Sequence, residues 1–148
     1  MKNLNNLTVL IVTYLTKKDI LLDCLKSIDK RIKILIIENS KKFKHEKFFL
    51  KKFPNVKILC TGSNLGYGNG NNFGLTLIKT QYALILNPDI ICDKKFFLNA
   101  DKLLNKKINF SIIGCQYSFD KIFMPAGYFN EKENKKFKNN FFKTKSKT

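Results

Sequence analysis

The sequence of 148 residues contains a single arginine, Arg31, a single histidine, His45, and no tryptophan. Base recognition and bidentate phosphate contacts favour the guanidinium group, so a chain with one arginine is poorly suited to sequence-specific nucleic-acid binding. One histidine and cysteines without a C-x-x-C pair do not make the ligand set of a structural zinc site. We interpret the cysteines as reduced thiols of a cytoplasmic protein: they are Cys24, Cys60, Cys92 and Cys115.

Long hydrophobic runs are also missing. The longest early apolar stretch, residues 7–15, is too short to span a bilayer and contains threonine and tyrosine. It lacks the basic start and the small-residue cleavage site of a signal peptide. These absences predict a cytoplasmic location for the protein.

Negative charge is scarce, because 28 lysine and arginine residues stand against 11 acidic ones and leave a net charge of +17. Lysines that neutralise phosphates bind nucleic acid without specificity, and salt suppresses that binding. We favour the simpler interpretation that the lysines cover solvated faces of a folded domain, so we expect no specific nucleic-acid partner. A peripheral contact with the anionic inner face of a membrane stays open.

Short apolar blocks alternate with amphipathic segments along most of the chain. The β-branched block at residues 8–13 is typical of a strand that is buried on both faces of a parallel sheet. Similar blocks recur with helical patterns between them, and Asp93 is placed to cap the last helix. The expected strands are residues 8–13, 33–37, 56–60, 82–86 and 110–115, and the expected helices include residues 19–28 and 44–53.

This alternation predicts an α/β fold, with a doubly wound, Rossmann-like, mostly parallel sheet and helices on both of its faces. We expect a hairpin over residues 116–129. Residues 1–129 are assigned to one domain. Residues 130–148 are rich in Lys, Asn and Phe without clear periodicity, which predicts a basic, disordered tail.

Polar residues follow each of the first four expected strands. Ligands of open α/β sheets bind outside the carboxyl ends of the strands, near the point where the strand order reverses. Any one cluster could be a turn, because Asn, Ser, Asp and Gly are common in turns, but the four together predict a binding site. The clusters are Thr13-Tyr14, Glu38-Asn39-Ser40, residues 61–70 and Asn87-Pro88-Asp89.

The glycine- and asparagine-rich segment 62–74 is expected to be a loop that leads into a helix ending near Lys79. Its glycines permit close backbone approach, so amide groups at the following helix N-terminus could face phosphate oxygens. The segment lacks the G-x-G-x-x-G fingerprint, because Asn71 occupies the place of the last glycine, and no G-K-[ST] follows it. A nicotinamide dehydrogenase and a P-loop enzyme are therefore disfavoured.

Asp89 is the predicted metal ligand. Pro88 prevents further ladder pairing, so the carboxylate of Asp89 projects from the strand end into the cleft. A hard cation such as Mg²⁺ or Mn²⁺ typically takes one or two carboxylates together with phosphate oxygens of the substrate. We expect one of these divalent cations as the cofactor.

These motifs together resemble those of the family-2 glycosyltransferases of the GT-A fold, most closely the rhamnosyltransferase-like branch. Val12-Thr13-Tyr14 resembles a V-T-Y-N motif with Leu15 in the last place, and Glu38-Asn39-Ser40 resembles a shortened V-D-N-x-S motif. Residues 64–74 match N-x-G-x-x-x-G-N-N-x-G. Asn87-Pro88-Asp89 is similar to the version of the D-x-D metal motif found in that branch.

The resemblance implies a nucleotide-sugar donor, most closely a UDP- or dTDP-sugar, and inverting transfer to a saccharide or lipid-linked acceptor in cell-surface polysaccharide biosynthesis. Thr13 and Tyr14 would contact the base, with Tyr14 stacking on it. Either Glu38 or Asn39 would hydrogen-bond the base or the ribose.

On the phosphate side, the resemblance implies that Asn64, Gly66 and Asn71 shape the loop over the donor. Asn87 would contact the substrate from the first position of D-x-D, and Asp89 would hold the metal on the diphosphate.

The family's general base lies beyond the fifth strand, in an acceptor half that we expect to be missing from this chain. Asp120 is interpreted as a turn residue, and Glu131 and Glu133 lie in a lysine-rich stretch without a sign of burial. Two functions stay open. The chain is either the donor half of a glycosyltransferase, completed by another chain, or an inactive nucleotide-sugar-binding module or remnant.

Overall fold

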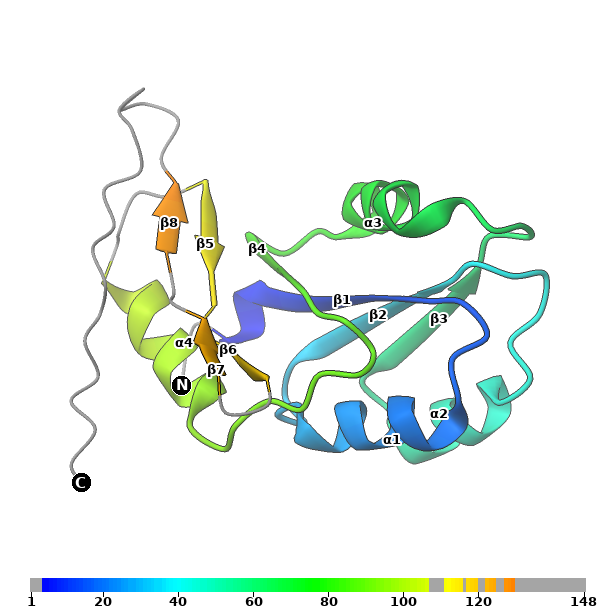
Figure 1. Cartoon of the computed structure of the whole chain (residues 1–148), viewed down its shortest axis with the longest axis horizontal. Coiled ribbons are helices and arrows are strands. Elements are labelled where there is room, and N and C mark those ends of the chain that lie inside the picture. Colours follow the sequence, from blue (N-terminus) through cyan, green and yellow to red (C-terminus); the bar gives the residue numbers. More distant parts are fainter. Residues whose placement is uncertain (1–3, 107–110, 116, 120–121, 125–126, 130–148) are drawn as a thin grey trace. The chain divides into compact units, whose positions relative to one another are not determined.

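Four parallel strands form one sheet, in the order β3-β2-β1-β4 (Figure 1). The computed structural model describes residues 4–106, 111–115, 117–119, 122–124 and 127–129. Every residue of β1 is buried, which confirms the predicted strand with both faces covered. The strands are β1 (Leu7–Thr13), β2 (Lys33–Glu38), β3 (Val56–Cys60) and β4 (Tyr82–Ile85).

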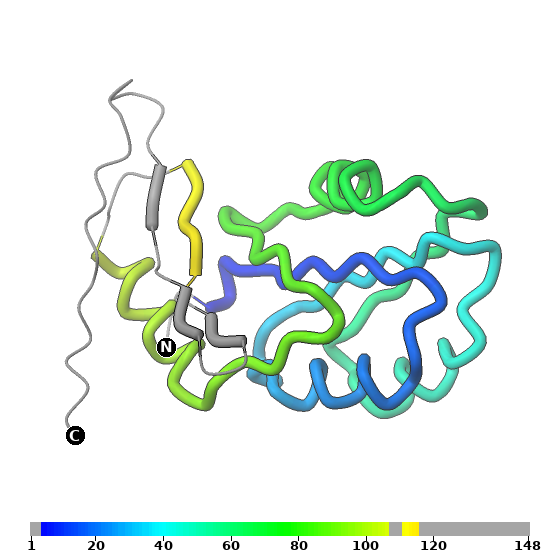
Figure 2. Tube along the Cα trace, viewed as in Figure 1, coloured from blue at the N-terminus to red at the C-terminus, as the bar shows by residue number. Residues whose placement is uncertain are grey.

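Helices cover both faces of this sheet, as predicted (Figure 1, Figure 2). On one face, α1 and α2 share a core with Val9 and Ile11 of β1. On the other face, α3 lies against Leu10 and Val12. Successive side chains of a strand point to opposite faces, so β1 must be apolar at both alternating sets of positions. The helices are α1 (Lys18–Ser27), α2 (Glu46–Lys52) and α3 (Gly66–Leu77).

Phe49 of α2 is fully buried among other aromatic rings. Its ring stacks on Phe43, with 5.7 Å between the centroids, and on Phe53, with 6.3 Å. Phe48 meets it edge-on at a centroid distance of 5.2 Å. Aromatic pairs of this kind contribute about 0.5–1.5 kcal/mol beyond their buried area. The cluster therefore anchors α2 to the sheet and confirms that the helix is amphipathic.

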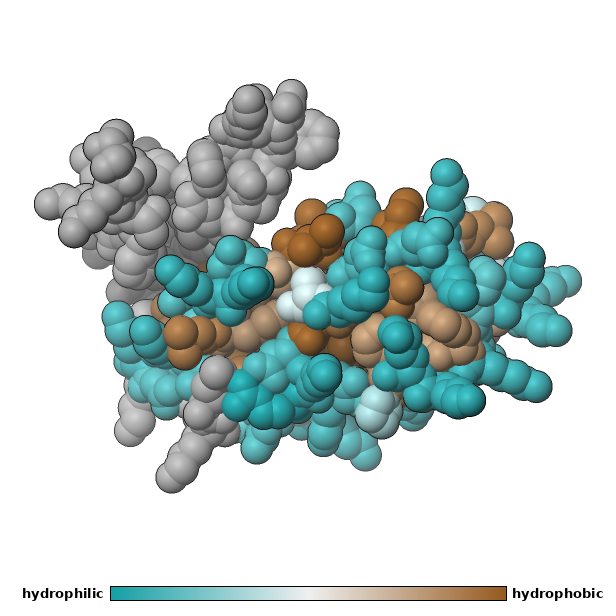
Figure 3. Space-filling model, turned by 90° about the horizontal axis from the view of Figure 1, so that it is seen from below, coloured by the Kyte–Doolittle hydropathy of each residue, from teal (hydrophilic) through white to brown (hydrophobic). Residues whose placement is uncertain are grey.

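The face that carries α1 and α2 is mostly hydrophilic, with hydrophobic side chains visible between the hydrophilic ones (Figure 3). Lys47, Lys51 and Lys52 of α2 are exposed there, as expected for lysines on a solvated face. Within the part of the chain that the structure describes, none of the helices combines the length and the hydrophobicity that crossing a membrane requires.

The segment predicted to be a glycine-rich loop is mostly helix, because α3 already begins at Gly66. Gly and Asn have low helix propensity, so local preference argues against a helix here. Tertiary packing outweighs that preference: Gly70 and Gly74 allow the helix backbone to lie directly on the sheet. A Cβ atom at Gly70 would meet Cγ1 of Val12 at 2.8 Å. The expectation of a loop up to residue 74 was wrong for this reason.

Substituting Gly74 with alanine is expected to destabilise the fold by about 1–3 kcal/mol, the usual cost of overpacking. The new Cβ would collide with Cδ1 of Leu10 and would lie 3.1 Å from Cγ1 of Ile37. Gly68→Ala is the matched control, since nothing lies within 4 Å of its Cβ position. This control should gain about 0.5–1 kcal/mol from helix propensity. Urea unfolding of both variants measures the difference, and equal stabilities would contradict the close packing.

Asp93 lies before the fourth helix, but it is not the capping residue that we predicted, because Lys95 occupies the N-cap position and no side chain caps the helix. The carboxylate of Asp93 accepts a hydrogen bond from the backbone N–H of Lys95 at 2.7 Å, and its carbonyl oxygen accepts one from that of Phe96 at 2.9 Å. These bonds close the turn that leads into the helix. The helix is α4 (Phe96–Asn105), and it packs beside the short 3-10 helix η1 (Leu4–Asn6).

The chain divides into two compact units, residues 1–106 and residues 107–148. In the second unit, the expected fifth strand is present, but it pairs antiparallel with β8 and does not extend the parallel sheet. An apolar run predicts a strand but not its partner. The segment expected as a hairpin contains an antiparallel pair of β6 with β7. The strands are β5 (Ile112–Gly114), β6 (Tyr117–Phe119), β7 (Ile122–Met124) and β8 (Gly127–Phe129).

Some predictions for the second unit concern residues that the structure does not describe. Asp120, Glu131 and Glu133 are among them, and so is the segment 130–148 that we expect to be a disordered tail. The turn at Asp120 and the domain boundary after residue 129 therefore stay predictions.

Candidate functional site

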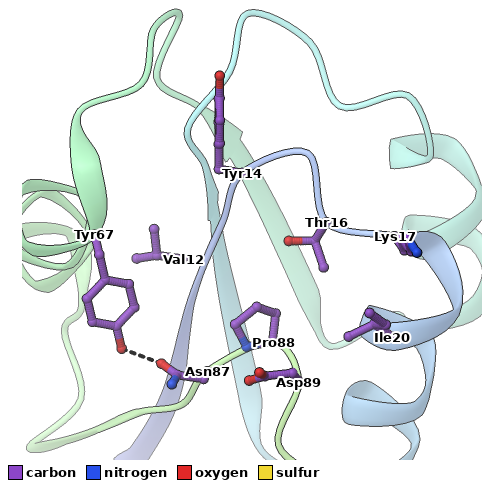
Figure 4. Close-up of a pocket in the computed structure, with 9 residues that line it drawn as sticks. All are labelled: Val12, Tyr14, Thr16, Lys17, Ile20, Tyr67, Asn87, Pro88 and Asp89. Carbon is purple, nitrogen blue, oxygen red and sulfur yellow. Dashed lines mark hydrogen bonds between the residues drawn. The ribbon is translucent and has the colours of Figure 1, made fainter.

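The strand order reverses at β1, because β2 and β3 lie on one side of it and β4 lies on the other. A pocket of about 520 Å³ opens beside the carboxyl ends of β1 and β4 (Figure 4). Ligands of open α/β sheets bind at such a reversal. The pocket is lined by Val12, Tyr14, Thr16, Lys17, Ile20, Tyr67, Asn87, Pro88 and Asp89.

The turn that carries Asn87 and Asp89 is held by hydrogen bonds to the carbonyl oxygen of Asn87. The N–H of Ile90 donates to this oxygen at 3.2 Å, and the thiol of Cys24 in α1 donates to it at 3.7 Å. Burial, with smaller contributions from Cys92 and Asp89, raises the pKa of the Cys24 thiol to about 12. The thiol therefore stays protonated at neutral pH and remains a donor to the turn.

Asp89 is the only acidic residue that lines the pocket, and Lys17 is the only basic one. Both residues are exposed. The described residues contain no group of three His, Cys, Asp or Glu side chains that could hold a metal ion. A site made of protein ligands alone does not fit, whereas one carboxylate fits a divalent cation that takes its other ligands from phosphates and water.

Tyr14 and Leu15 project from the end of β1, with exposed fractions of 52% and 72%. Leu15 has a φ of +52°, a left-handed conformation that is uncommon for residues with a Cβ atom. Glu38 stabilises this turn: its Oε2 accepts a hydrogen bond from the Thr13 hydroxyl at 2.6 Å, and its Oε1 accepts one from the N–H of Leu15 at 3.4 Å. Glu38 is only 1% exposed, so it stabilises the turn from its buried side, while the side chain of Tyr14 on the same turn is exposed.

Asn39 is likewise 1% exposed, and it ties the end of β2 to the start of α3. Its Nδ2 donates to the carbonyl oxygen of Gly66 at 3.0 Å, while Oδ1 of Asn64 accepts from the N–H of Gly66 at 2.9 Å. Gly66 has a φ of +78°, which favours glycine. These contacts define where the helix begins and how its first turn stands beside the pocket.

Asn71 lies in the part of α3 that faces the sheet and is 6% exposed. Its Nδ2 donates to the carbonyl oxygen of Tyr67 at 3.0 Å. Its Oδ1 is buried without a hydrogen-bond partner among the described residues. Asn71 therefore supports the turn of α3 from which Tyr67 reaches the pocket.

Of the predicted donor contacts, Tyr14, Asn87 and Asp89 come together in the pocket. The others do not line it: Thr13, Glu38, Asn39 and Asn71 are buried, Gly66 begins α3, and Asn64 precedes the helix and accepts a hydrogen bond from Gly66. Their predicted contacts with the donor stay predictions.

Lys17 and Tyr67 line the pocket but have no counterpart among the predicted contacts. Lys17 lies shortly after the first expected strand, and that position could have identified it. Tyr67 is the one aromatic residue near the start of the glycine-rich segment, and the residues around it in the sequence do not indicate that it reaches the turn after β4.

The sheet order and the pocket at its reversal define a GT-A-like α/β domain, and solved glycosyltransferase structures share this fold. The mannosyltransferase PcManGT from Pyrobaculum calidifontis, in complex with GDP-Man and Mn²⁺, aligns with a TM-score of 0.63 at 13% identity, over 77% of this chain and 36% of that one. S. aureus TarS 1-349 aligns with a TM-score of 0.59 at 16% identity, over 68% of this chain and 32% of that one. This chain thus spans about a third of the length of these structures.

The sequence profile of glycosyl transferase family 2 matches residues 8–147, so the chain belongs to this family. The family inferred from the motifs is thereby confirmed, while its rhamnosyltransferase-like branch stays a prediction. No curated protein sequence matches this chain.

Proposed function

We propose that this chain forms the donor-binding part of an inverting glycosyltransferase, and that its pocket binds a nucleotide-diphospho-sugar together with Mg²⁺ or Mn²⁺. The observation that carries the proposal is the position of Asp89, an exposed carboxylate in the pocket where the strand order reverses. A mannosyltransferase of similar fold was solved with GDP-Man and Mn²⁺, which supports ligands of these two classes. A UDP- or dTDP-sugar is the donor that we propose for this chain, by resemblance to the rhamnosyltransferase-like branch.

Each end of the donor has a candidate partner in the pocket. Tyr14 is half exposed at the end of β1 and can stack on the base. Asp89 would hold the divalent cation, which neutralises charge on the departing diphosphate. Lys17 adds a positive charge that favours phosphate on the α1 side of the pocket. The pocket thus combines an aromatic surface, a carboxylate for the cation and an ammonium group for the phosphates.

The acceptor side requires a general base, and the pocket offers no second carboxylate among the described residues. We propose that the base and the saccharide or lipid-linked acceptor are provided outside this pocket, at a cytoplasmic site in peripheral contact with the membrane. This same observation supports the alternative, a module that holds the nucleotide-sugar without transferring it. Incubation with donor sugars and acceptors separates the two: sugar transfer supports the enzyme, and binding without transfer supports the module.

Calorimetric titration with UDP, dTDP and GDP, in Mn²⁺ and in EDTA, tests the proposed function. We expect at least one of these nucleotides to bind, and to bind more tightly in Mn²⁺, because Asp89 would hold a cation that neutralises charge on the diphosphate. Equal affinities in Mn²⁺ and EDTA would contradict the role of Asp89. If none of the nucleotides bound under either condition, the proposed function itself would be wrong.

A further inference from the structure

Asn87 occupies the first position of the D-x-D-like motif, and its side chain is already engaged by the helix on the other side of the pocket. The hydroxyl of Tyr67, in the first turn of α3, donates a hydrogen bond to Oδ1 of Asn87 at 2.7 Å (Figure 4). This is the usual length of a good O–H···O bond. The contact links α3 to the turn after β4 across the pocket, and both residues line that pocket.

This hydrogen bond orients the Asn87 amide in the pocket. A carboxamide has one oxygen that accepts and one NH₂ group that donates. Tyr67 occupies one of the two lone pairs of the oxygen, and the Nδ2 group is the end of the amide that has no hydrogen-bond partner among the described residues. An NH₂ group cannot ligate Mg²⁺ or Mn²⁺, which take oxygen ligands, but it donates well to a phosphate oxygen.

We propose that Asn87 binds an oxygen of the donor diphosphate through Nδ2, as a hydrogen-bond donor oriented by Tyr67, and does not ligate the metal. Asp89 is then the only ligand that this motif gives to the cation. Tyr67 is a positioning residue, because it acts on the donor through Asn87. This inference rests on the proposed binding of a nucleoside diphosphate.

The surroundings of Asn87 agree with its role as a hydrogen-bond donor to an anion. Lys17 lines the same pocket and attracts the phosphates, whereas a second carboxylate at position 87 would repel them in the absence of metal. The backbone carbonyl oxygen of Asn87 accepts from Ile90 and from Cys24, so the main chain beneath the side chain is held as well. The amide is therefore presented in one orientation before the donor arrives, which lowers the cost of binding.

Two substitutions test this assignment with UDP, dTDP or GDP, whichever the wild-type chain binds most tightly. Asn87→Asp replaces the NH₂ donor with an oxygen and adds a negative charge, so the affinity measured in EDTA should fall by about 10- to 100-fold. Tyr67→Phe leaves Asn87 in place but frees its amide to rotate, so the affinity should fall by about 2- to 10-fold. If Tyr67 acts through Asn87, Tyr67→Phe should have no further effect in an Asn87→Ala background.

Asn72→Asp is the charge-matched control, because Asn72 is an exposed residue of α3 that does not line the pocket. It should leave the affinity unchanged, and thermal unfolding of each variant confirms that the fold is intact. If Asn87 is instead a metal ligand, Asn87→Asp should raise the affinity in Mn²⁺ above that of the wild type, and the uncharged Asn87→Ala variant should leave the affinity in EDTA unchanged, whereas the inference expects Asn87→Ala to weaken binding in EDTA. That result would overturn the inference while the proposed function stands. If the wild-type chain bound no nucleoside diphosphate, both would fail.

Discussion

Replacing Asp89 with alanine is expected to weaken the Mn²⁺-dependent binding of a nucleoside diphosphate by about 1–3 kcal/mol, or about 5- to 150-fold in Kd. Asp89 is the only acidic residue of the pocket, so no other lining carboxylate can take over the cation. In EDTA the variant should bind as tightly as the wild type, or more tightly, because the carboxylate then only repels the diphosphate. Calorimetry in both conditions measures the two effects.

Asp93→Ala is the matched control for this experiment. Asp93 is an exposed carboxylate nearby in the sequence, but it does not line the pocket and accepts a hydrogen bond from the N–H of Lys95 at 2.7 Å. Its removal should cost about 0.5–1.5 kcal/mol of stability, the usual worth of one hydrogen bond, and leave nucleotide affinity unchanged. Equal losses of affinity in the two variants would show that negative charge in this region, and not a ligand at Asp89, governs binding.

Replacing Phe49 with alanine is expected to destabilise the first unit by about 3–5 kcal/mol, which is a large share of the stability of a typical domain. Phe49 is 0% exposed and contacts the rings of Phe43, Phe48 and Phe53. Its removal leaves a cavity where α2 meets the sheet, and neighbouring rings can close it only in part. Urea unfolding, followed by circular dichroism, measures the change.

Phe48→Ala provides the comparison within the same helix. Phe48 is 37% exposed, and the ammonium group of Lys18 lies 3.8 Å from the centre of its ring. Such an exposed cation–π contact is worth about 0.5–1 kcal/mol, so the variant should lose much less stability than Phe49→Ala. Similar losses for both variants would contradict the buried position of Phe49 beneath α2.

The sequence alone was sufficient for the features that depend on local pattern. The block at residues 8–13 is apolar at every position, and a strand covered on both faces requires that pattern whatever its partners are. Asp89 follows Pro88 at the end of an expected strand, so its place at the sheet edge also follows from its neighbours in the chain. Family membership was inferred from the order of such local motifs, and the match of the family profile to residues 8–147 confirms it.

The direction in which a polar side chain points could not be predicted in this way. Glu38 and Asn39 belong to a polar cluster at the same sheet edge as Tyr14, yet both are 1% exposed and Tyr14 is 52% exposed. Glu38 turns inward because the buried Thr13 hydroxyl needs an acceptor, and the same carboxylate accepts from the N–H of Leu15. The donors that require this acceptor belong to a neighbouring strand and the turn after it, so the residues next to Glu38 in the sequence do not indicate its orientation.

The sequence by itself determined the strands, the family and the position of Asp89 at the sheet edge, because each of these follows from residues close together in the chain. Only the tertiary structure decided that residues 66–74 are helical and that Tyr67 reaches Asn87. The helix exists because Gly70 and Gly74 lie on side chains of β1, against the local preference of glycine and asparagine. The Tyr67–Asn87 contact joins α3 to the turn after β4, and the packing of separate segments sets such a contact.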